Sequence, residues 1–119
     1  MRILIADDER AFVELLSESL TQMGNEVECA YDGGSALALI KKNKYDIILL
    51  DHNMPELTGL ELVKYIRENK IEAKTVMITG YVDMNKTFMK VIGVDEYLTK
   101  PVKLADVYAI LEKYSKNLH

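Results

Sequence analysis

The sequence predicts an α/β fold of the (βα)5 type: a doubly wound, five-stranded parallel sheet with strand order 2-1-3-4-5 and helices on both faces. Short apolar runs alternate with segments of helical hydrophobic periodicity along the whole chain. Such alternation favours parallel strands joined by right-handed crossover helices. Residues 47–50, Ile-Ile-Leu-Leu, are apolar without alternation, which is typical of a strand covered on both faces. A chain of 119 residues is too short for an eight-fold barrel of about 250 residues, so an open sheet fits best.

The N-terminal half contains the first three expected strands and the two helices between them. The apolar residues 3–6 predict the first strand, the alternating residues 27–31 the second, and residues 47–50 the third. Residues 9–23 have helical periodicity, and a glycine follows them as a helix stop signal. A second, shorter helix is expected over residues 33–42. The apolar face of the first helix is expected to comprise Phe12, Leu15, Leu16, Leu20 and Met23.

The C-terminal half repeats the same pattern. Helical periodicity predicts a third helix through residues 60–69 and a last helix over residues 104–116, while residues 75–79 and 94–99 predict the fourth and fifth strands. Between these strands, Met84, Phe88 and Val91 share one helical face and mark a fourth helix, which Gly93 ends. Its apolar residues cannot all face inward, so we expect some in the core and others in an exposed patch that binds a partner. These residues are Met84, Phe88, Met89, Val91 and Ile92.

Composition indicates one globular domain over residues 1–119 and excludes several classes of partner. Fifteen basic against nineteen acidic residues give a net charge of −4, and the chain has no basic stripe for direct nucleic-acid binding. No apolar run approaches the roughly 20 residues of a membrane span, and the N-terminus lacks the longer apolar region of a signal peptide. The single cysteine, Cys29, cannot form an internal disulfide. We therefore expect a cytoplasmic protein without membrane insertion.

Polar and charged residues follow four of the five expected strands. Asp7-Asp8 follows the first, Asp51 the third, Thr79 the fourth, and Lys100 the fifth. In an open α/β sheet, ligands bind beyond the carboxyl ends of the strands, so these side chains are expected to meet at one rim. Three carboxylates at one rim repel one another and favour a bound cation. Hard oxygen ligands in a small cluster suit Mg²⁺.

The same residues form a set that suits phosphoryl transfer. Transfer of a phosphoryl group depends mainly on positioning and on charge stabilisation, which a metal, a lysine and a hydroxyl provide. A carboxylate can act as the covalent nucleophile in such a reaction. A carboxylate of this rim, with Lys100 and Thr79 near it, is therefore a candidate phosphoryl acceptor.

Four stretches carry a resemblance to a known family, and together they extend over most of the chain. They are residues 3–9 (Ile-Leu-Ile-Ala-Asp-Asp-Glu), 47–55 (Ile-Ile-Leu-Leu-Asp-His-Asn-Met-Pro), 77–81 (Met-Ile-Thr-Gly-Tyr) and 95–101 (Asp-Glu-Tyr-Leu-Thr-Lys-Pro). In their order and spacing the chain resembles the receiver domains of two-component response regulators, whose sheets have the flavodoxin-like order. The resemblance implies a phosphoprotein of a phosphorelay.

The resemblance implies a role for each residue of the rim. Asp51 would accept a phosphoryl group from the phosphohistidine of a histidine kinase or a phosphotransfer protein. Asp7 and Asp8 would hold Mg²⁺, or Mn²⁺, together with Asp51 and the main-chain carbonyl of Asn53. Thr79 would donate a hydrogen bond to a phosphoryl oxygen, with Lys100 as its ionic partner.

The resemblance also implies a route for the signal. Tyr97 would be the aromatic switch residue that responds to Thr79, and Pro101 would follow a cis peptide bond. The output surface would comprise the fourth helix, the fifth strand and the fifth helix, where a downstream protein target would bind. We expect His52 to be exposed and without a catalytic role.

Three departures from the family pattern fall near this output surface. Gly80 stands where another small residue, often alanine, is usual, and Val94 stands where a smaller residue is usual. The spacing from Thr79 to Lys100 is about one residue shorter than the family's. A glycine there is expected to loosen the entry to the fourth helix. These changes leave the acceptor site intact.

Three functions other than that of a receiver domain make different demands on the sequence. A dehalogenase-type phosphatase would need a second acid two positions after the nucleophile, where this chain has Asn53, so turnover of an external metabolite is not expected. A flavin-phosphate module would need a Ser-, Thr- and Gly-rich loop in place of Asp7-Asp8-Glu9. A locked receiver fold acting only as a scaffold stays open, as does the choice between a stand-alone receiver and a domain of a longer regulator.

Overall fold

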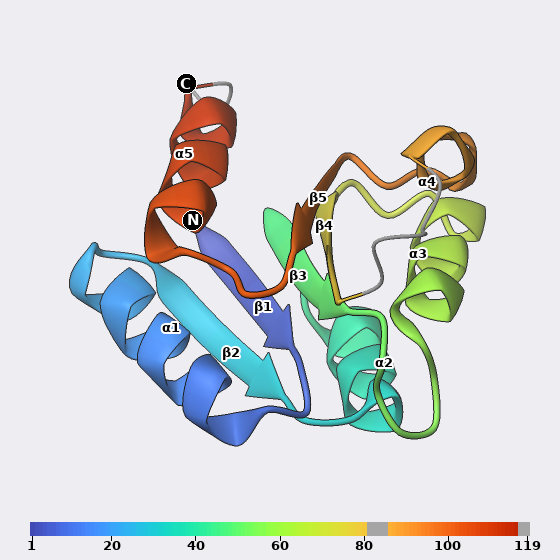
Figure 1. Cartoon of the computed structure of the whole chain (residues 1–119). Helices are drawn as coiled ribbons and strands as arrows, with labels where there is room; N and C mark the ends of the chain where they lie inside the picture. Colours follow the sequence, from blue (N-terminus) through green and yellow to red (C-terminus); the bar gives the residue numbers. More distant parts are fainter. Residues whose placement is uncertain (81–85, 117–119) are drawn as a thin grey trace.

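The computed structural model describes residues 1–80 and 86–116, and it has the expected α/β architecture. Five parallel strands pair in the order β2-β1-β3-β4-β5, so the predicted sheet order is confirmed (Figure 1). The strands are β1 (Arg2–Ala6), β2 (Glu26–Ala30), β3 (Ile47–Asp51), β4 (Lys74–Thr79) and β5 (Glu96–Thr99). The helices are α1 (Arg10–Gln22), α2 (Gly33–Lys42), α3 (Gly59–Glu68), α4 (Lys86–Ile92) and α5 (Leu104–Ser115).

The sheet separates two apolar cores. On one face, α1 and α5 cover alternate side chains of the central strands, among them Ile5 and Leu49. On the other face, α2, α3 and α4 cover the intervening side chains, among them Leu4 and Leu50. Strand β3 is buried at every position, which explains why its sequence is apolar without alternation.

The beginnings of α2 and α3 are set by local sequence. The Asp32 side chain accepts a hydrogen bond from the Ser35 backbone N–H at 2.6 Å and so caps α2. Thr58 and Glu61 form a reciprocal capping box at the start of α3. Because α3 follows directly after the loop from Asp51, this box also fixes the exit of that loop.

Two glycines allow close backbone approaches near the carboxyl end of β3. A Cβ atom on Gly33, the first residue of α2, would lie 2.3 Å from the carbonyl oxygen of Leu57. A Cβ atom on Gly59, the first residue of α3, would lie 2.9 Å from the carbonyl oxygen of Asp51. Only glycine leaves room for these contacts, and they pack the loop after Asp51 against both helices.

The predicted inward face of α1 is partly wrong, whereas the apolar residues of α4 divide as expected. In α1 the buried residues are Val13, Leu16 and Leu20, whereas Leu15 and Met23 are exposed. In α4, Met89 is buried and Ile92 is half-buried, but Phe88 and Val91 are 54% and 79% exposed. The expected division of these apolar residues between the core and an exposed face is therefore confirmed for the described residues, and Met84 lies outside them.

Arg67, in the last turn of α3, joins that helix to α4, β4 and β5. Its Nε donates to the Gly93 carbonyl at 2.9 Å, directly after α4. Its Nη2 donates to Asp95 Oδ2 at 2.6 Å and to Thr75 Oγ1 at 3.2 Å. Asp95 Oδ2 also accepts from the Thr75 backbone N–H at 2.8 Å. The C-terminal end of α4 is thus held by a charge-assisted network.

No helix in the described part of the chain is long and apolar enough to cross a membrane.

Candidate functional site

The carboxyl ends of β1 and β3 bring three carboxylates together. Asp7, directly after β1, and Asp51, the last residue of β3, are both buried, whereas Asp8 is exposed. One carboxylate oxygen from each lies within 4.8 Å of the others. The two neighbouring parallel strands thus place the acidic side chains at one rim, as the positions after the strands predict.

Each buried carboxylate has one oxygen bonded to the backbone and one that is not. Asp7 Oδ1 accepts from the Glu9 N–H at 2.9 Å, and Asp51 Oδ1 accepts from the Asn53 N–H at 3.2 Å. Asp7 Oδ2 and Asp51 Oδ2 have no hydrogen-bond partner among the described residues. The Lys100 ammonium lies 3.6 Å and 3.3 Å from these two oxygens, respectively.

Burial shifts the proton affinities of this cluster. Loss of hydration on burial raises the pKa of Asp7 to about 6, and the neighbouring Asp51 carboxylate adds to the effect. Burial also raises the pKa of Asp51, against the opposing effect of the Lys100 ammonium. Burial alone would lower the pKa of Lys100, but the carboxylates of Glu9, Asp7 and Asp51 outweigh it and raise that pKa. The cluster therefore has excess negative charge that one lysine does not balance.

A small hard cation fits this set of donors. Two buried carboxylate oxygens lack hydrogen-bond donors in the described part of the chain, and a third carboxylate, from Asp8, lies beside them at the surface. Mg²⁺ is typically bound by one or two carboxylates together with waters and phosphate oxygens. The exposed position of Asp8 leaves room for such additional ligands.

The other predicted site residues lie at the same end of the sheet. Thr79 is buried at the end of β4, where it pairs with Thr99, and its carbonyl accepts from the Lys100 N–H at 2.9 Å. Asn53 is exposed in the loop after Asp51. The peptide bond between Lys100 and Pro101 is cis.

Two further predicted residues flank the cluster. Tyr97, in β5, is half-buried and packs against the core under α2, α3 and α4. His52 is half-buried, which corrects the expectation that it is exposed. Its backbone explains this, because His52 donates to the Ile78 carbonyl at 3.0 Å and accepts from the Gly59 N–H at 3.2 Å.

Glu9 is a member of the site that sequence reasoning missed as a partner of Lys100. Its carboxylate lies 2.6 Å from Lys100 Nζ, closer than either buried aspartate. The only sequence signal is its position directly after Asp7-Asp8, because the two partners are 91 residues apart.

The entry to α4 is only partly described. Gly80 is exposed after β4, and residues 81–85 lie outside the described residues. Val94 is buried and follows the Arg67-bonded carbonyl of Gly93. The predicted loosening at Gly80 therefore stays a prediction.

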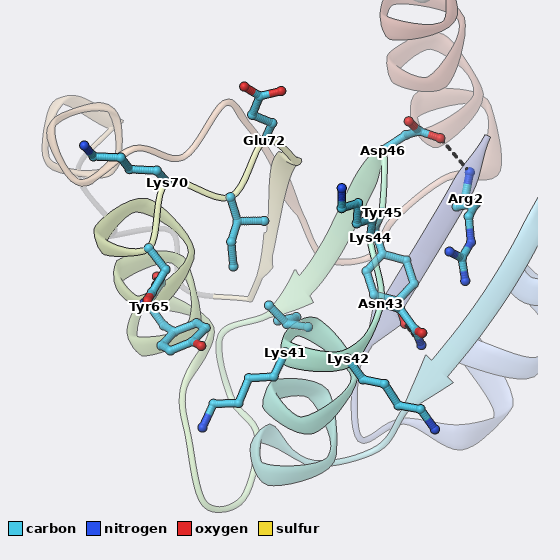
Figure 2. A pocket seen from close by; sticks show the side chains of 13 residues that line it. Arg2, Lys41, Lys42, Asn43, Lys44, Tyr45, Asp46, Tyr65, Lys70 and Glu72 are labelled. Atoms are coloured by element: carbon cyan, nitrogen blue, oxygen red, sulfur yellow. Dashed lines mark hydrogen bonds between the residues drawn. The ribbon is translucent and has the colours of Figure 1, made fainter.

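A separate cavity of about 880 Å³ lies at the opposite end of the sheet, by the amino-terminal ends of β1 and β3 (Figure 2). Arg2 at the start of β1, Asp46 just before β3, and the C-terminal ends of α2 and α3 line it. Tyr45 and Asn43 at this cavity bond to Glu28. Asp7, Asp8 and Asp51, which form the acidic rim, do not line this cavity. The candidate site is therefore defined by the chemistry of these carboxylates and not by the volume of a cavity.

Comparison with known proteins agrees with this geometry. Residues 3–112 match the family described as response regulator receiver domain. The transcriptional regulatory protein DltR of Streptococcus agalactiae is 33% identical over 113 residues, which cover 92% of this chain and 49% of DltR. This chain spans about half the length of the curated relatives it matches.

Two solved structures are similar over nearly their full length. The receiver domain of the Francisella response regulator 1452 is 28% identical with a TM-score of 0.89, covering 99% of this chain and 98% of that one. TrrA of Thermotoga maritima, solved in complex with Mg²⁺-BeF, is 34% identical with a TM-score of 0.84, covering 95% and 97%. Sequence, fold and the acidic rim agree, and the chain belongs to the receiver domain family of two-component response regulators.

Proposed function

We propose that this receiver domain accepts a phosphoryl group on Asp51 from the phosphohistidine of a histidine kinase or a phosphotransfer protein, in a reaction that requires Mg²⁺ or Mn²⁺. One observation carries the proposal. Asp51 lies buried in a cluster with the carboxylates of Asp7 and Asp8, and the Lys100 ammonium is 3.3 Å from Asp51 Oδ2.

In the proposed step, a carboxylate oxygen of Asp51 attacks the phosphorus atom. The bond from phosphorus to the histidine nitrogen breaks, and its electron pair stays on the imidazole, which takes up a proton. The product is an aspartyl phosphate. The hydrogen bond from the Asn53 N–H to Asp51 Oδ1 orients the carboxylate, and its Oδ2 lies 3.3 Å from the Lys100 ammonium.

Asp7, Asp8, Asp51 and the main-chain carbonyl of Asn53 would hold the divalent ion. When bound, the ion neutralises the carboxylates and the charge that develops on the phosphoryl oxygens. TrrA, which is 34% identical, was solved with Mg²⁺-BeF, and its likeness supports this assignment.

Lys100 and Thr79 would stabilise the phosphoryl group after transfer. Both lie at the carboxyl ends of β4 and β5, and the Thr79 carbonyl binds the Lys100 N–H. Hydrolysis by water would return the Asp51 carboxylate and release inorganic phosphate. The family is not one of turnover enzymes for metabolites, so the aspartyl phosphate is the signal itself.

Thr79 and Tyr97 would then transmit the state of Asp51 to the surface of α4, β5 and α5, where a downstream protein binds. Thr79 is buried at the end of β4, and Tyr97 is half-buried on the adjacent strand. A shift of the Thr79 side chain toward the phosphoryl group would change the space next to Tyr97.

Intact-mass measurement tests the acceptor assignment. We expect wild-type protein incubated with acetyl phosphate and Mg²⁺ to gain the mass of one phosphoryl group. Asp51→Asn should gain none, and EDTA should abolish the gain. Asp106→Asn, an exposed acid in the first turn of α5, removes the same charge and should behave as wild type. Modification of Asp51→Asn at the wild-type rate would refute the proposal.

Beryllofluoride distinguishes a working switch from a locked scaffold. Added with Mg²⁺, it is expected to shift the NMR signals of Thr79 and Tyr97 in addition to those of the acidic rim. Binding that shifts only the rim would indicate a receiver that accepts the group without changing its output surface.

A further inference from the structure

Glu9 makes the closest charged contact in the site. Lys100 Nζ lies 2.6 Å from Glu9 Oε1, against 3.3 Å from Asp51 and 3.6 Å from Asp7. The Glu9 side chain is 59% exposed, whereas the side chains of Asp7 and Asp51 are buried. Lys100 therefore has an outer partner at the surface in addition to two inner ones.

The inner contacts of Lys100 are with the oxygens that a cation would need. They are Asp7 Oδ2 and Asp51 Oδ2, which have no hydrogen-bond donor among the described residues. With a divalent ion held there by Asp7 and Asp51, these two carboxylates would no longer be available to the ammonium, which would be repelled by the ion's charge. Within the described part of the chain, the acidic cluster that could hold a metal comprises Asp7, Asp8 and Asp51, and Glu9 is not part of it.

The backbone of Glu9 is fixed independently of Lys100. Its N–H donates to Asp7 Oδ1 at 2.9 Å, and its carbonyl accepts from the Val13 N–H at 3.0 Å. Glu9 is the residue that precedes the first turn of α1, where a carboxylate is favoured by the helix dipole. It can therefore stay in place when the charge of the inner site changes.

We propose that Glu9 is a positioning residue, which holds the Lys100 ammonium at the edge of the site when a cation occupies Asp7 and Asp51. Lys100 then stays within reach of the oxygens of a phosphoryl group on Asp51 instead of moving into solvent. This inference rests on the proposed function of Asp51 and adds a residue to that site.

NMR of the lysine ammonium groups tests the inference without any phosphoryl transfer. The Lys100 signal is identified by its absence from Lys100→Ala. With saturating Mg²⁺, we expect the signal to persist in wild type and to disappear in Glu9→Gln, because an ammonium without a charged partner exchanges its protons rapidly with water. Glu9→Asp, which keeps the charge, should restore part of it.

Glu14→Gln is the matched control. Glu14 is exposed on the same helix, and its loss removes the same charge away from Lys100, so its spectrum should match wild type. A Lys100 signal that persists in Glu9→Gln with Mg²⁺ would overturn the inference. So would a signal that wild type loses when Mg²⁺ is added.

A double-mutant cycle on the rate of phosphoryl uptake provides the second readout. With saturating Mg²⁺ and acetyl phosphate, Glu9→Gln should slow uptake three- to tenfold, as expected for loss of a partly exposed charged hydrogen bond. The same substitution in Lys100→Ala should have no further effect. Equal slowing in both backgrounds would contradict action through Lys100. If wild type takes up no phosphoryl group, the proposed function fails, and the ammonium signals still decide the role of Glu9.

Discussion

The buried carboxylate of Asp7 lowers the stability of the metal-free fold, and the same carboxylate is part of the proposed metal site. Its carboxylate is fully buried, one of its oxygens has no hydrogen-bond donor among the described residues, and a second buried carboxylate lies beside it. Without a cation, ionisation of Asp7 is therefore less favourable in the folded chain than in the unfolded one, and its pKa is raised to about 6.

Asp7→Asn is expected to stabilise the metal-free protein in a pH-dependent way. The unfolded chain loses the Asp7 proton near pH 4 and the folded chain near pH 6, so the folded state binds more protons in this window. The contribution of Asp7 to wild-type stability then falls as the pH rises from 4 to 6. The variant lacks this loss, so we expect its advantage to grow from near zero at pH 4 to about 2–3 kcal/mol at pH 7.

Urea unfolding in EDTA at several pH values measures this difference. Asp106→Asn serves as the control, because it removes an exposed acid outside the cluster. An advantage of Asp7→Asn that stays constant from pH 4 to pH 7 would show that ionisation of Asp7 is not its source.

At the scale of residues, the sequence predicts the buried carboxylates and their lysine better than it predicts Glu9 at the surface of the site. Asp7, Asp51 and Lys100 lie at the carboxyl ends of strands, and parallel strands bring such positions to one rim. Glu9 has no such signal, because an acid at the start of a helix is common for reasons of capping and dipole alone. Its contact with Lys100 depends on side-chain rotamers, which the hydrophobic pattern does not specify.

Among the elements, α2 begins with two glycines that meet different neighbours. A Cβ atom on Gly33 would lie 2.3 Å from the backbone oxygen of Leu57. A Cβ atom on Gly34 would instead meet the carboxylate of Glu56, which is the end of a flexible, exposed side chain. Only the first contact requires the backbone of the loop after β3 to move.

We therefore expect Gly33→Ala and Gly34→Ala to have opposite effects on stability. Gly33→Ala should destabilise the fold by about 1–3 kcal/mol, because it overpacks a fixed backbone contact. Gly34→Ala should be neutral or stabilising by up to about 1 kcal/mol, because alanine reduces the entropy of the unfolded chain. Chemical denaturation of the two variants measures both, and equal destabilisation would contradict the difference in their surroundings.

The inward faces of the helices were less predictable than their positions. In α1 the pattern of five apolar residues is wider than the buried stripe, which follows the i, i+3, i+7 spacing of Val13, Leu16 and Leu20. In α4, seven residues make only two turns, so the periodicity fits more than one face. Packing against α3 and the sheet decides which of those faces is buried.

For the whole molecule, the proposed metal binding would be coupled to folding through the cluster of Asp7, Asp8 and Asp51. Asp7 and Asp51 come from strands that meet only in the folded sheet, so the unfolded chain offers no comparable site. A ligand that binds only the folded state stabilises it according to its concentration and affinity. The charge that weakens the metal-free fold would thus be the source of the proposed stabilisation by a cation.

Mg²⁺ is expected to raise the melting temperature, and more so at pH 8 than at pH 5. At a concentration 100 times the Kd, the stabilisation is about 2.7 kcal/mol, which corresponds to an increase on the order of 10 °C for a domain of this size. At pH 5 protons compete for Asp7, whose pKa is about 6, so the increase should be smaller. Calorimetry checks this against NaCl at equal ionic strength, and an equal increase with NaCl would exclude a specific site.

The contacts of Arg67 restrain the C-terminal end of α4 more than its first turn. The guanidinium fixes the Gly93 carbonyl and Asp95, so the C-terminal end of the helix is attached to α3 and β4. If α4 moves when Asp51 is modified, we expect it to rotate about this attached end, and the displacement to be largest about 10 Å away at its first turn. A binding protein that contacts only the region around Gly93 would find the same surface in both states. One that contacts the first turn would discriminate between them.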